Sequence, residues 1–306
     1  MTLSDTGDEQ RVPDREMSMG MWDRLFRRAR RKGQDALEQE QPLSKGHRRV
    51  DPLEIGQGTD IGKIREANED AFLTLKSLIG TQPEPVPVGL LLIADGMGGH
   101  AGGKEASSMA IRVASGILAR EILLPLLESQ ATTVASRPIQ EVLSEATVSA
   151  NDAVSQTEGD AGTTLTSVIV MGHSAYIAHV GDTRVYYLNS GELQQITQDH
   201  SLVKRLVELG QISVEEAQHH PQRNFLYRAV GQGPELTVDT YFQRLAESSY
   251  LLLCSDGLWN QVSDEEMVEV IENTSSLQQA CNLLIDRANT RGGEDNITVV
   301  LAKVNY

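Results

Sequence analysis

The chain has 306 residues, 40% of them hydrophobic and 4% aromatic, which is enough for one large domain with an appendage or for two modest domains. Its net charge of −16 is uneven: residues 1–50 carry 11 Lys or Arg and 9 Asp or Glu, whereas the rest carries 16 basic and 34 acidic residues. So acidic a body argues against a nucleic-acid partner and suits divalent cations.

Residues 1–50 are expected to form a flexible N-terminal extension, because their apolar residues are too sparse for a core. Within it, residues 20–32 contain a short basic amphipathic segment, and four apolar residues recur there at helical spacing: Trp22, Leu25, Phe26 and Ala29. Such a segment can contact a membrane surface or a protein partner. A solvated tail with a chance pattern is the alternative, and the sequence leaves the choice open.

The globular pattern begins at residue 51, so one domain is predicted over 51–306. Apolar and β-branched runs predict strands at 59–63, 71–75 and 88–94, a proline-containing loop at 80–87, and helices at 102–123 and 138–157. Four short β-rich runs follow at 163–170, 174–180, 184–188 and 192–197. Their turns are too short for parallel crossovers, which predicts antiparallel hairpins.

The last third alternates again. We expect a small helical insert after residue 198, a strand at 250–255, helices at 263–274 and 277–290, and a final strand at 297–304. Ser263 and Glu266 have the spacing of a capping box at the start of their helix. This order of elements favours an α+β sandwich, with helices layered on antiparallel sheets, over a doubly wound parallel sheet.

Cellular location is read from two features. No apolar run approaches the ~20 residues of a membrane-spanning helix, and the first 20 residues are too polar for a secretory signal. Cys254 and Cys281 lie in apolar segments without metal-ligand spacing, which predicts buried free thiols in a reducing compartment. We therefore expect a cytoplasmic protein.

Carboxylates recur where loops meet strand ends, at Glu69-Asp70, Asp95-Gly96, Asp256-Gly257 and Asp295-Asn296. Each Asp-Gly alone is most often a plain turn, but together these acids could face one pocket. Clustered carboxylates repel one another, and oxygen ligands select hard cations such as Mg²⁺ or Mn²⁺. Two such ions can activate a water and polarise a phosphoryl group. Arg65 adds a guanidinium able to bind two phosphate oxygens.

Six motifs in order resemble the PPM-type (type 2C) metal-dependent Ser/Thr protein phosphatases, in their compact bacterial form. The resemblance spans residues 54–304 and rests on Arg65-Glu66-Ala67-Asn68-Glu69-Asp70, Ala94-Asp95-Gly96-Met97-Gly98-Gly99-His100, Gly162-Thr163-Thr164, Val180-Gly181-Asp182-Thr183-Arg184, Ser255-Asp256-Gly257-Leu258-Trp259 and Gly293-Glu294-Asp295-Asn296-Ile297-Thr298. It implies a sandwich of two antiparallel β-sheets flanked by helices on both outer faces. It also implies hydrolysis of phosphoserine and phosphothreonine by a metal-bound water at a dinuclear Mn²⁺ or Mg²⁺ centre.

The resemblance also implies the metal ligands. Asp95 would bridge the two ions, Gly96 would lend its carbonyl oxygen, and Asp256 and Asp295 would complete the first ion.

The second ion and the substrate have their own residues in the family. Glu69 and Asp70 would act near the second ion, and Arg65 would hold the substrate phosphate. Asp182 would help to bind a third, looser ion, and residues 198–231 would form a flap beside the site. The expected partners are phosphorylated proteins and a Ser/Thr kinase, and we expect a monomer.

The chain departs from animal members at Met97, where they carry a histidine proposed as general acid, so the acid for the leaving group is left unassigned. Thr183 replaces a more frequent serine. His100 is expected to be structural, and Ser255 lacks the elbow motif of a nucleophilic serine. Two alternatives remain: a catalytically silent regulator that keeps the fold and docks partners, and a phosphatase recruited by a sensing partner through residues 20–32.

Overall fold

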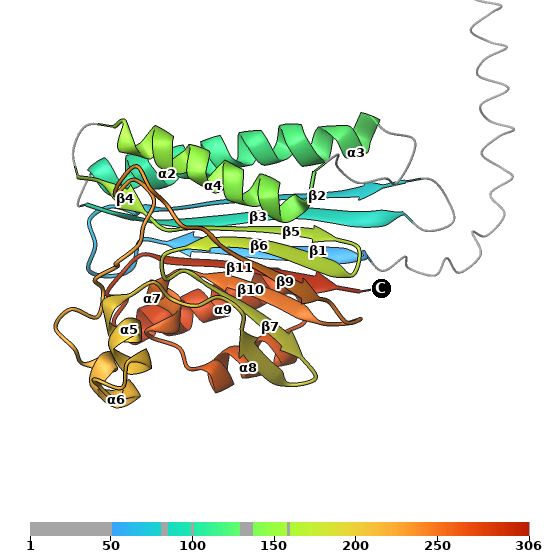
Figure 1. Ribbon diagram of the computed structural model, residues 1–306. Helices are drawn as coiled ribbons and strands as arrows, with labels where there is room; N and C mark the ends of the chain where they lie inside the picture. The colour runs from blue at the N-terminus through green and yellow to red at the C-terminus, as the bar shows by residue number, and fades with distance from the viewer. Residues whose placement is uncertain (1–50, 81–84, 99–100, 129–136, 158–159, 306) are drawn as a thin grey trace, which may run out of the picture. The chain divides into compact units, whose positions relative to one another are not determined.

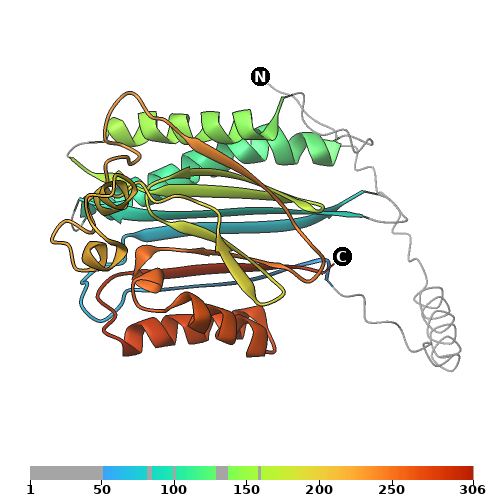
Figure 2. The same cartoon turned by 60° about the horizontal axis from the view of Figure 1, so that its bottom comes forward.

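The computed structural model describes residues 51–80, 85–98, 101–128, 137–157 and 160–305 (Figure 1). The predictions for the extension at 1–50 and for His100 lie outside the described residues. Two antiparallel β-sheets are stacked face to face, and helices cover the outer face of each, so the predicted α-β-β-α sandwich is confirmed (Figures 1 and 2).

The first sheet has the strand order β1-β11-β10-β7-β8, and all its pairs are antiparallel. Its strands are β1 (Leu53–Asp60), β11 (Ile297–Val304), β10 (Tyr250–Cys254), β7 (Arg184–Asn189) and β8 (Glu192–Gln195). The second sheet has the order β2-β3-β5-β6-β9, with β4 paired to the end of β3. Its strands are β2 (Asp70–Ile79), β3 (Val86–Met97), β5 (Leu165–Met171), β6 (Ser174–Val180), β9 (Asp239–Arg244) and β4 (Gly162–Thr163).

Two groups of helices form the outer layers (Figure 1). Over the second sheet lie α2 (Ala101–Leu118), its continuation through the π-turn η1 (Ala119–Leu123) into α3 (Leu124–Glu128), and α4 (Ile139–Ser155). Over the first sheet lie α7 (Asp256–Trp259), α8 (Asp264–Asn273) and α9 (Leu277–Thr290). Two further helices, α5 (Leu202–Glu208) and α6 (Val214–Gln218), belong to the insert that we call the flap, residues 198–231.

Strand alternation builds a core in three layers, and β3 illustrates how. Leu90 and Leu92 face the helices α2 and α4, whereas Leu91 and Ile93 face the other sheet. Successive side chains of a strand point to opposite faces, so an unbroken apolar run is needed when both faces are buried. Fully burying one such side chain contributes about 1.5–3 kcal/mol. The run therefore fixes β3 in the middle of the molecule and carries Asp95 to its edge.

Two predictions about the strands were wrong, and one strand was missed. The first strand was predicted at 59–63, but it runs from Leu53 to Asp60. The turn at 181–183 is not a hairpin, because β6 belongs to the second sheet and β7 to the first, so the chain crosses between sheets there. Strand β9 was not predicted, because its side chains are half-buried or exposed and give little apolar signal. Both cysteines are buried free thiols, as expected. In the parts of the chain that the structure describes, no helix is long and apolar enough to cross a membrane.

Candidate active site

The pairing of β2 with β3 sets two predicted acids opposite each other, because Asp70 is the register partner of Asp95. Asp70 Oδ2 accepts hydrogen bonds from Ser255 Oγ (2.8 Å) and Thr298 Oγ1 (2.6 Å). Ser255 precedes α7 and Thr298 lies in β11, so these donors come from the first sheet while Asp70 belongs to the second. Asp70 Oδ1 is buried and has no hydrogen-bond partner among the described residues.

Asp256 begins α7 at the end of β10 and is only 7% exposed. Asn260 Nδ2 donates to its Oδ2 at 3.3 Å, whereas Oδ1 is buried without a partner in the described part of the chain. Burial, together with the charges of Asp182 and Asp295, raises the pKa of Asp256 well above its ordinary value. A buried carboxylate oxygen without a donor is a group that a cation can satisfy.

Asp295 lies in the loop before β11. Its Oδ2 accepts a hydrogen bond from Arg65 Nη2 at 2.6 Å, and its Oδ1 accepts one from the backbone N–H of Asn296 at 2.8 Å. The side chain of Arg65 is 45% exposed, so solvent and solutes reach the guanidinium. The predicted phosphate-binding arginine and a predicted metal ligand are therefore neighbours.

Asn296 joins the loop that carries Arg65 to the strand end that carries Asp295. Its Nδ2 donates to the carbonyl oxygens of Ile61 (2.9 Å) and Ala67 (3.0 Å), and its Oδ1 accepts from the N–H of Glu69 (2.8 Å). All of the hydrogen-bonding groups of a buried amide are thus used to fix the loop.

Glu69 is buried and lies against the start of α2. Its carbonyl oxygen accepts a hydrogen bond from Ser107 Oγ at 2.6 Å. A Cβ added to Gly103 would come within 3.0 Å of the Glu69 carboxyl carbon, and one added to Gly96 would overlap the carbonyl oxygen of Gly103. Only glycine allows the end of β3, the helix start and Glu69 to pack this closely.

The backbone around Asp95 is held by β4 and the residue that follows it. The N–H of Asp95 donates to Thr164 Oγ1 (2.8 Å), and its carbonyl oxygen accepts from Thr163 Oγ1 (2.8 Å) and from the N–H of Thr164 (2.9 Å). Neither threonine was assigned a role from the sequence, although both belong to one of the six motifs. These bonds fix the backbone of Asp95 on both sides of its Cα.

Asp182 lies in the crossover between β6 and β7 and is 6% exposed. Its carbonyl oxygen accepts a hydrogen bond from Trp259 Nε1 (3.1 Å), and the guanidinium of Arg184 stacks 3.6 Å from the centre of the Trp259 ring. Burial, with the charge of Asp199 added, raises the pKa of Asp182 to about 7.

The acids are close enough to change one another's protonation. The pKa of Asp95 is raised well above its ordinary value, first by burial and then by four neighbouring charges, those of Asp70, Asp256, Asp182 and Asp295. Burial likewise raises the pKa of Asp70 to about 6, against the opposing hydrogen bonds from Thr298 and Ser255. Grouped carboxylates of this kind are stabilised by a divalent cation.

The predicted acids are thus gathered at one end of the sandwich, although far apart in sequence. Within the described ranges, no three His, Cys, Asp or Glu side chains converge as a finished set of metal ligands. Two of the acids instead use oxygens to accept bonds from Arg65, Ser255 and Thr298. The donor chemistry and the two buried, unpaired oxygens fit a hard cation.

Two smaller predictions have clear outcomes. Ser255 Oγ bonds Asp70 and also accepts the N–H of Thr298 (2.9 Å), which agrees with rejecting it as a nucleophile. Asp199 and Ser201 are residue types that cap helices, and their place at the start of the insert predicts that they cap its first helix. Ser201 is the N-cap of α5, but Asp199 is not a cap, because Arg184 bonds both of its carboxylate oxygens. The half-buried Arg184 binds this carboxylate in preference to the helix end because its paired N–H groups match both oxygens.

Comparison with known proteins agrees with this arrangement. The chain matches the family described as protein phosphatase 2C over residues 67–291. A serine/threonine phosphatase stp from Listeria monocytogenes is 40% identical over 248 residues, covering 80% of this chain and 93% of the relative. The crystal structure of the Mycobacterium tuberculosis serine/threonine phosphatase PstP/Ppp has a TM-score of 0.69 and 32% identity, covering 83% of this chain and 99% of that one. The crystal structure of the catalytic domain of PstP in complex with two manganese ions has a TM-score of 0.67 and 30% identity. It covers 83% of this chain and 99% of that one.

Fold, gathered carboxylates and similarity together define a metal-dependent phosphoric monoester hydrolase. The chain belongs to the protein phosphatase 2C family and is a bacterial-type serine/threonine protein phosphatase.

Proposed function

We propose that the acids at the end of the sandwich bind two Mn²⁺ or Mg²⁺ ions. Asp95 would bridge the ions with the Gly96 carbonyl beside it, Asp256 and Asp295 would complete one ion, and Asp70 would act at the other. The observation that carries this proposal is the pair of buried carboxylate oxygens, Asp70 Oδ1 and Asp256 Oδ1, that have no donor among the described residues. Such oxygens cost free energy unless a cation or donor reaches them.

Two further acids are assigned by position. Glu69 is proposed to act near the second ion, since it is buried beside Gly96 and Gly103. Asp182 is proposed to hold a third, more weakly bound ion. It is buried, and it lies close enough to Asp95 and Asp256 for its charge to raise the pKa of both. The relative that contains two manganese ions supports the count of the tighter pair.

When bound, the ions supply charge to the phosphoryl oxygens and lower the pKa of the attacking water. This chain's own residues do the rest. Arg65 binds two oxygens of the phosphate, which fixes the phosphomonoester for attack opposite its leaving oxygen. The thioether of Met97 carries no titratable proton, so the leaving group receives its proton from another source than residue 97.

The substrates are proposed to be phosphoserine and phosphothreonine in proteins, supplied by a Ser/Thr kinase. We propose that the enzyme acts as a monomer in the cytoplasm, where two buried free thiols are stable. Residues 51–306 are proposed to be the complete catalytic unit, with residues 198–231 as a flap beside the site.

The test is turnover of a phosphothreonine peptide after EDTA treatment, then with Mn²⁺ restored. We expect no turnover with EDTA, recovery with Mn²⁺, and a loss of about 10³-fold or more in Asp95→Asn, because metal charge supplies several kcal/mol to the transition state. The matched control is Glu145→Gln. Glu145 is an exposed carboxylate on α4 that pairs with Arg137, and this variant should behave as wild type.

Calorimetric titration with Mn²⁺ counts the sites directly. Full activity of Asp95→Asn, or turnover that persists in EDTA, would refute the metal assignment. A folded wild type that binds Mn²⁺ without turning over any phosphopeptide would favour the silent regulator instead.

A further inference from the structure

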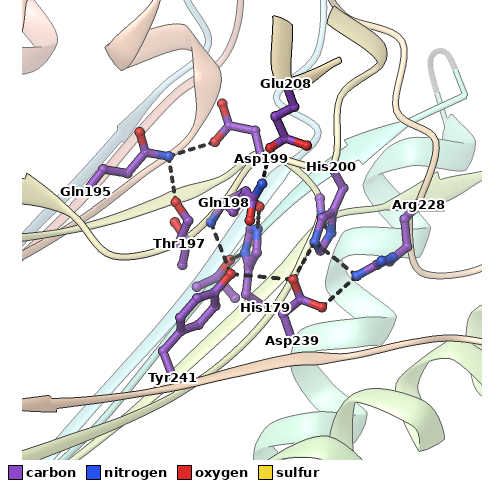
Figure 3. A network of polar contacts seen from close by, with 12 residues as sticks. His179, Gln195, Thr197, Gln198, Asp199, His200, Glu208, Arg228, Asp239 and Tyr241 are labelled. Atoms are coloured by element: carbon purple, nitrogen blue, oxygen red, sulfur yellow. Dashed lines mark hydrogen bonds and ion pairs between the residues drawn. The ribbon is translucent and has the colours of Figure 1, made fainter. Parts of the chain in front are cut away.

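Two buried histidines are hydrogen-bonded to the segments on either side of Asp182 and take no part in the proposed chemistry. His200 bonds Gly181 directly, and His179 is connected to Thr183 through Thr166. The rings of His179 and His200 are 4.9 Å apart between centroids, and both side chains are almost fully buried. Figure 3 shows His179, from β6, and His200, from the start of the flap, beside Asp239 of β9 within a network of polar side chains. Their hydrogen bonds determine which ring nitrogens carry protons.

His200 connects the crossover turn to β9. Its Nδ1 accepts the N–H of Gly181 at 3.0 Å, so the proton of the neutral ring is on Nε2 and is donated to Asp239 Oδ2 at 3.1 Å. Arg228 Nη1 also lies 3.1 Å from Nε2, but a guanidinium only donates, so with this tautomer its hydrogen bond goes to Asp239 Oδ1. The backbone N–H of His200 in turn donates to the carbonyl oxygen of Gly181 at 2.7 Å. One residue of the flap therefore binds both backbone groups of the residue before Asp182.

Asp239 holds both ends of the flap. Its Oδ2 accepts from His200 at the first end, and its Oδ1 accepts from Arg228 Nη1 (2.7 Å) at the second (Figure 3). Next to it, the hydroxyl of Tyr241 accepts the N–H of Gln198 at 3.2 Å. The two ends also pair with each other, because Ser201 and Leu226 form an antiparallel bridge.

A second chain of hydrogen bonds runs on the other side of Asp182. His179 Nε2 lies 3.1 Å from the carbonyl oxygen of Gln198, which can only accept, so Nε2 carries the proton. Its Nδ1 must then accept from Thr166 Oγ1 (2.9 Å), and Thr166 Oγ1 must accept from Thr183 Oγ1 (2.6 Å). All three hydrogen bonds of this series therefore donate in the same direction, from Thr183 toward Gln198 in the flap.

The crossover turn has little freedom to move by itself. Gly181 has a φ of 112°, and a Cβ there would overlap the side chain of Thr164. Trp259 holds the carbonyl oxygen of Asp182 from the opposite side. The position of Asp182 is thus defined by Gly181, Thr183 and Trp259, and the first two are bonded into the flap.

We infer that Asp239 is a positioning residue that couples the flap to the ion bound at Asp182. Through His200 and Arg228 it holds the two ends of the flap in the arrangement that aims Asp182 into the site. Because coupling between sites is reciprocal, an ion at Asp182 stabilises the flap by the same factor by which the ordered flap tightens that ion. The inference rests on the proposed role of Asp182.

The test compares Asp239→Asn with Asp182→Asn and with the control Glu145→Gln, all in the full-length chain. The amide keeps the size of Asp239, but it has one oxygen to offer to His200 and Arg228 and turns an NH₂ group toward the other donor. Trp22→Phe in each background leaves Trp259 as the only tryptophan and as a fluorescent reporter of the Asp182 carbonyl. The measurements are Mn²⁺ titration by calorimetry and by Trp259 fluorescence, and amide hydrogen exchange of residues 199–209.

We expect Asp182→Asn to remove the weakest Mn²⁺ site. Asp239→Asn should weaken the same site by about tenfold, within the usual range of coupling between sites, and leave the tighter sites unchanged. Wild type should exchange flap amides more slowly when Mn²⁺ fills that site, and Asp239→Asn should lose this protection. Glu145→Gln should match wild type throughout.

The outcomes separate the two claims. If Asp182→Asn removes a site and Asp239→Asn leaves its affinity unchanged, the coupling is wrong and the metal assignment stands. If Asp182→Asn removes no site, the assignment of Asp182 fails and the coupling fails with it. Should Asp239→Asn not fold, Tyr241→Phe is the second variant. It removes the hydroxyl that accepts Gln198 N–H and donates to Asp239 Oδ2. Weaker binding at the same site supports the coupling, and unchanged binding overturns it.

Discussion

At the scale of single residues, the neutral groups around the acids decide how the site is arranged. Ser255 and Thr298 donate to Asp70, and Asn296 ties the Arg65 loop to the turn of Asp295. These groups hold charged side chains in place without neutralising them. Their neighbours orient the acids and leave Oδ1 of Asp70 and Oδ1 of Asp256 without a donor in the described part of the chain.

Arg65 is predicted to bind the substrate phosphate rather than to hold the metal. We expect Arg65→Ala to raise KM for phosphate esters by about tenfold or more, the effect of losing a charge-assisted bidentate contact. Arg65→Lys should recover only part of this, because an ammonium lacks the fork geometry. Steady-state kinetics with an aryl phosphate and Mn²⁺ titrations measure the two effects. If the loss lies in Mn²⁺ affinity and KM is unchanged, the assignment is wrong.

His179 is predicted to limit stability in acid. Burial, and then the neighbouring His200, lower the pKa of His179 to about 3. The unfolded chain takes up this proton near pH 6.5, whereas the folded protein does so only near pH 3, so stability is lost as pH falls through that interval. The slope is at most about 1.4 kcal/mol per pH unit for one group. Urea unfolding between pH 7 and 5 should give a flatter profile for His179→Asn than for wild type, and parallel profiles would contradict this.

At the scale of elements, the sequence predicted most of the regular helices and strands accurately. The predicted elements at 174–180, 277–290 and 297–304 have the bounds of β6, α9 and β11. Their signals are strong because apolar periodicity and end signals agree. Strand β9 alternates half-buried residues with the exposed residues Thr240, Phe242 and Arg244, and its place at the edge of a sheet follows from pairing with β6 alone.

Some residues of the site could be predicted from the sequence and others could not. The clustered acids lie at the ends of apolar strands, either before or after them, so the sequence indicated them. Their hydroxyl partners do not: Ser255 and Thr298 are 43 residues apart, and only the pairing of β10 with β11 turns both toward Asp70. Asp239 was missed for the same reason, since its role arises from contacts across 39 and 11 residues. Interactions between distant segments leave no local pattern to read.

The capping box of α8 gives a test at this scale. Ser263 accepts the N–H of Glu266, whose side chain returns to the N–H of Ser263, and α8 buries Met267, Val270 and Ile271. Ser263→Ala should lower the free energy of unfolding by about 1 kcal/mol, measured in urea, with unchanged kcat.

The matched control uses the same motif in the flap. Ser213 caps α6 in an equivalent box, but α6 buries none of its residues. Ser213→Ala should therefore change global stability much less than Ser263→Ala. Equal losses would mean that α6 contributes to the cooperative core.

At the scale of the whole molecule, the active site lies where two sheets meet. Asp70 and Asp95 belong to the second sheet, whereas Asp256 and Asp295 follow or precede strands of the first. The apolar layer between the sheets, which includes Leu91, Leu253 and Val300, sets the separation of the two pairs of acids. The packing of the central core therefore determines the spacing of the proposed metal ligands.

The same view predicts that residues 1–50 are dispensable for chemistry. The family match covers residues 67–291, and the described contacts of the acids all lie between residues 51 and 305. A chain beginning at residue 51 should keep kcat and KM for an aryl phosphate within about twofold, since no transition-state contact is lost. An inactive truncated enzyme would contradict the proposed domain boundary.

The position of β11 has a consequence for biosynthesis. This strand is the last of the fold along the chain, yet it lies between β1 and β10 in the interior of its sheet. While a ribosome is still translating the preceding helices, β1 has no neighbour to pair with, and the residues around Asp295 do not yet exist. With Asp295 as a proposed metal ligand, we expect the nascent domain to become active only after nearly all of it has been made. Its first sheet is incomplete until then and leaves apolar surface open to chaperones.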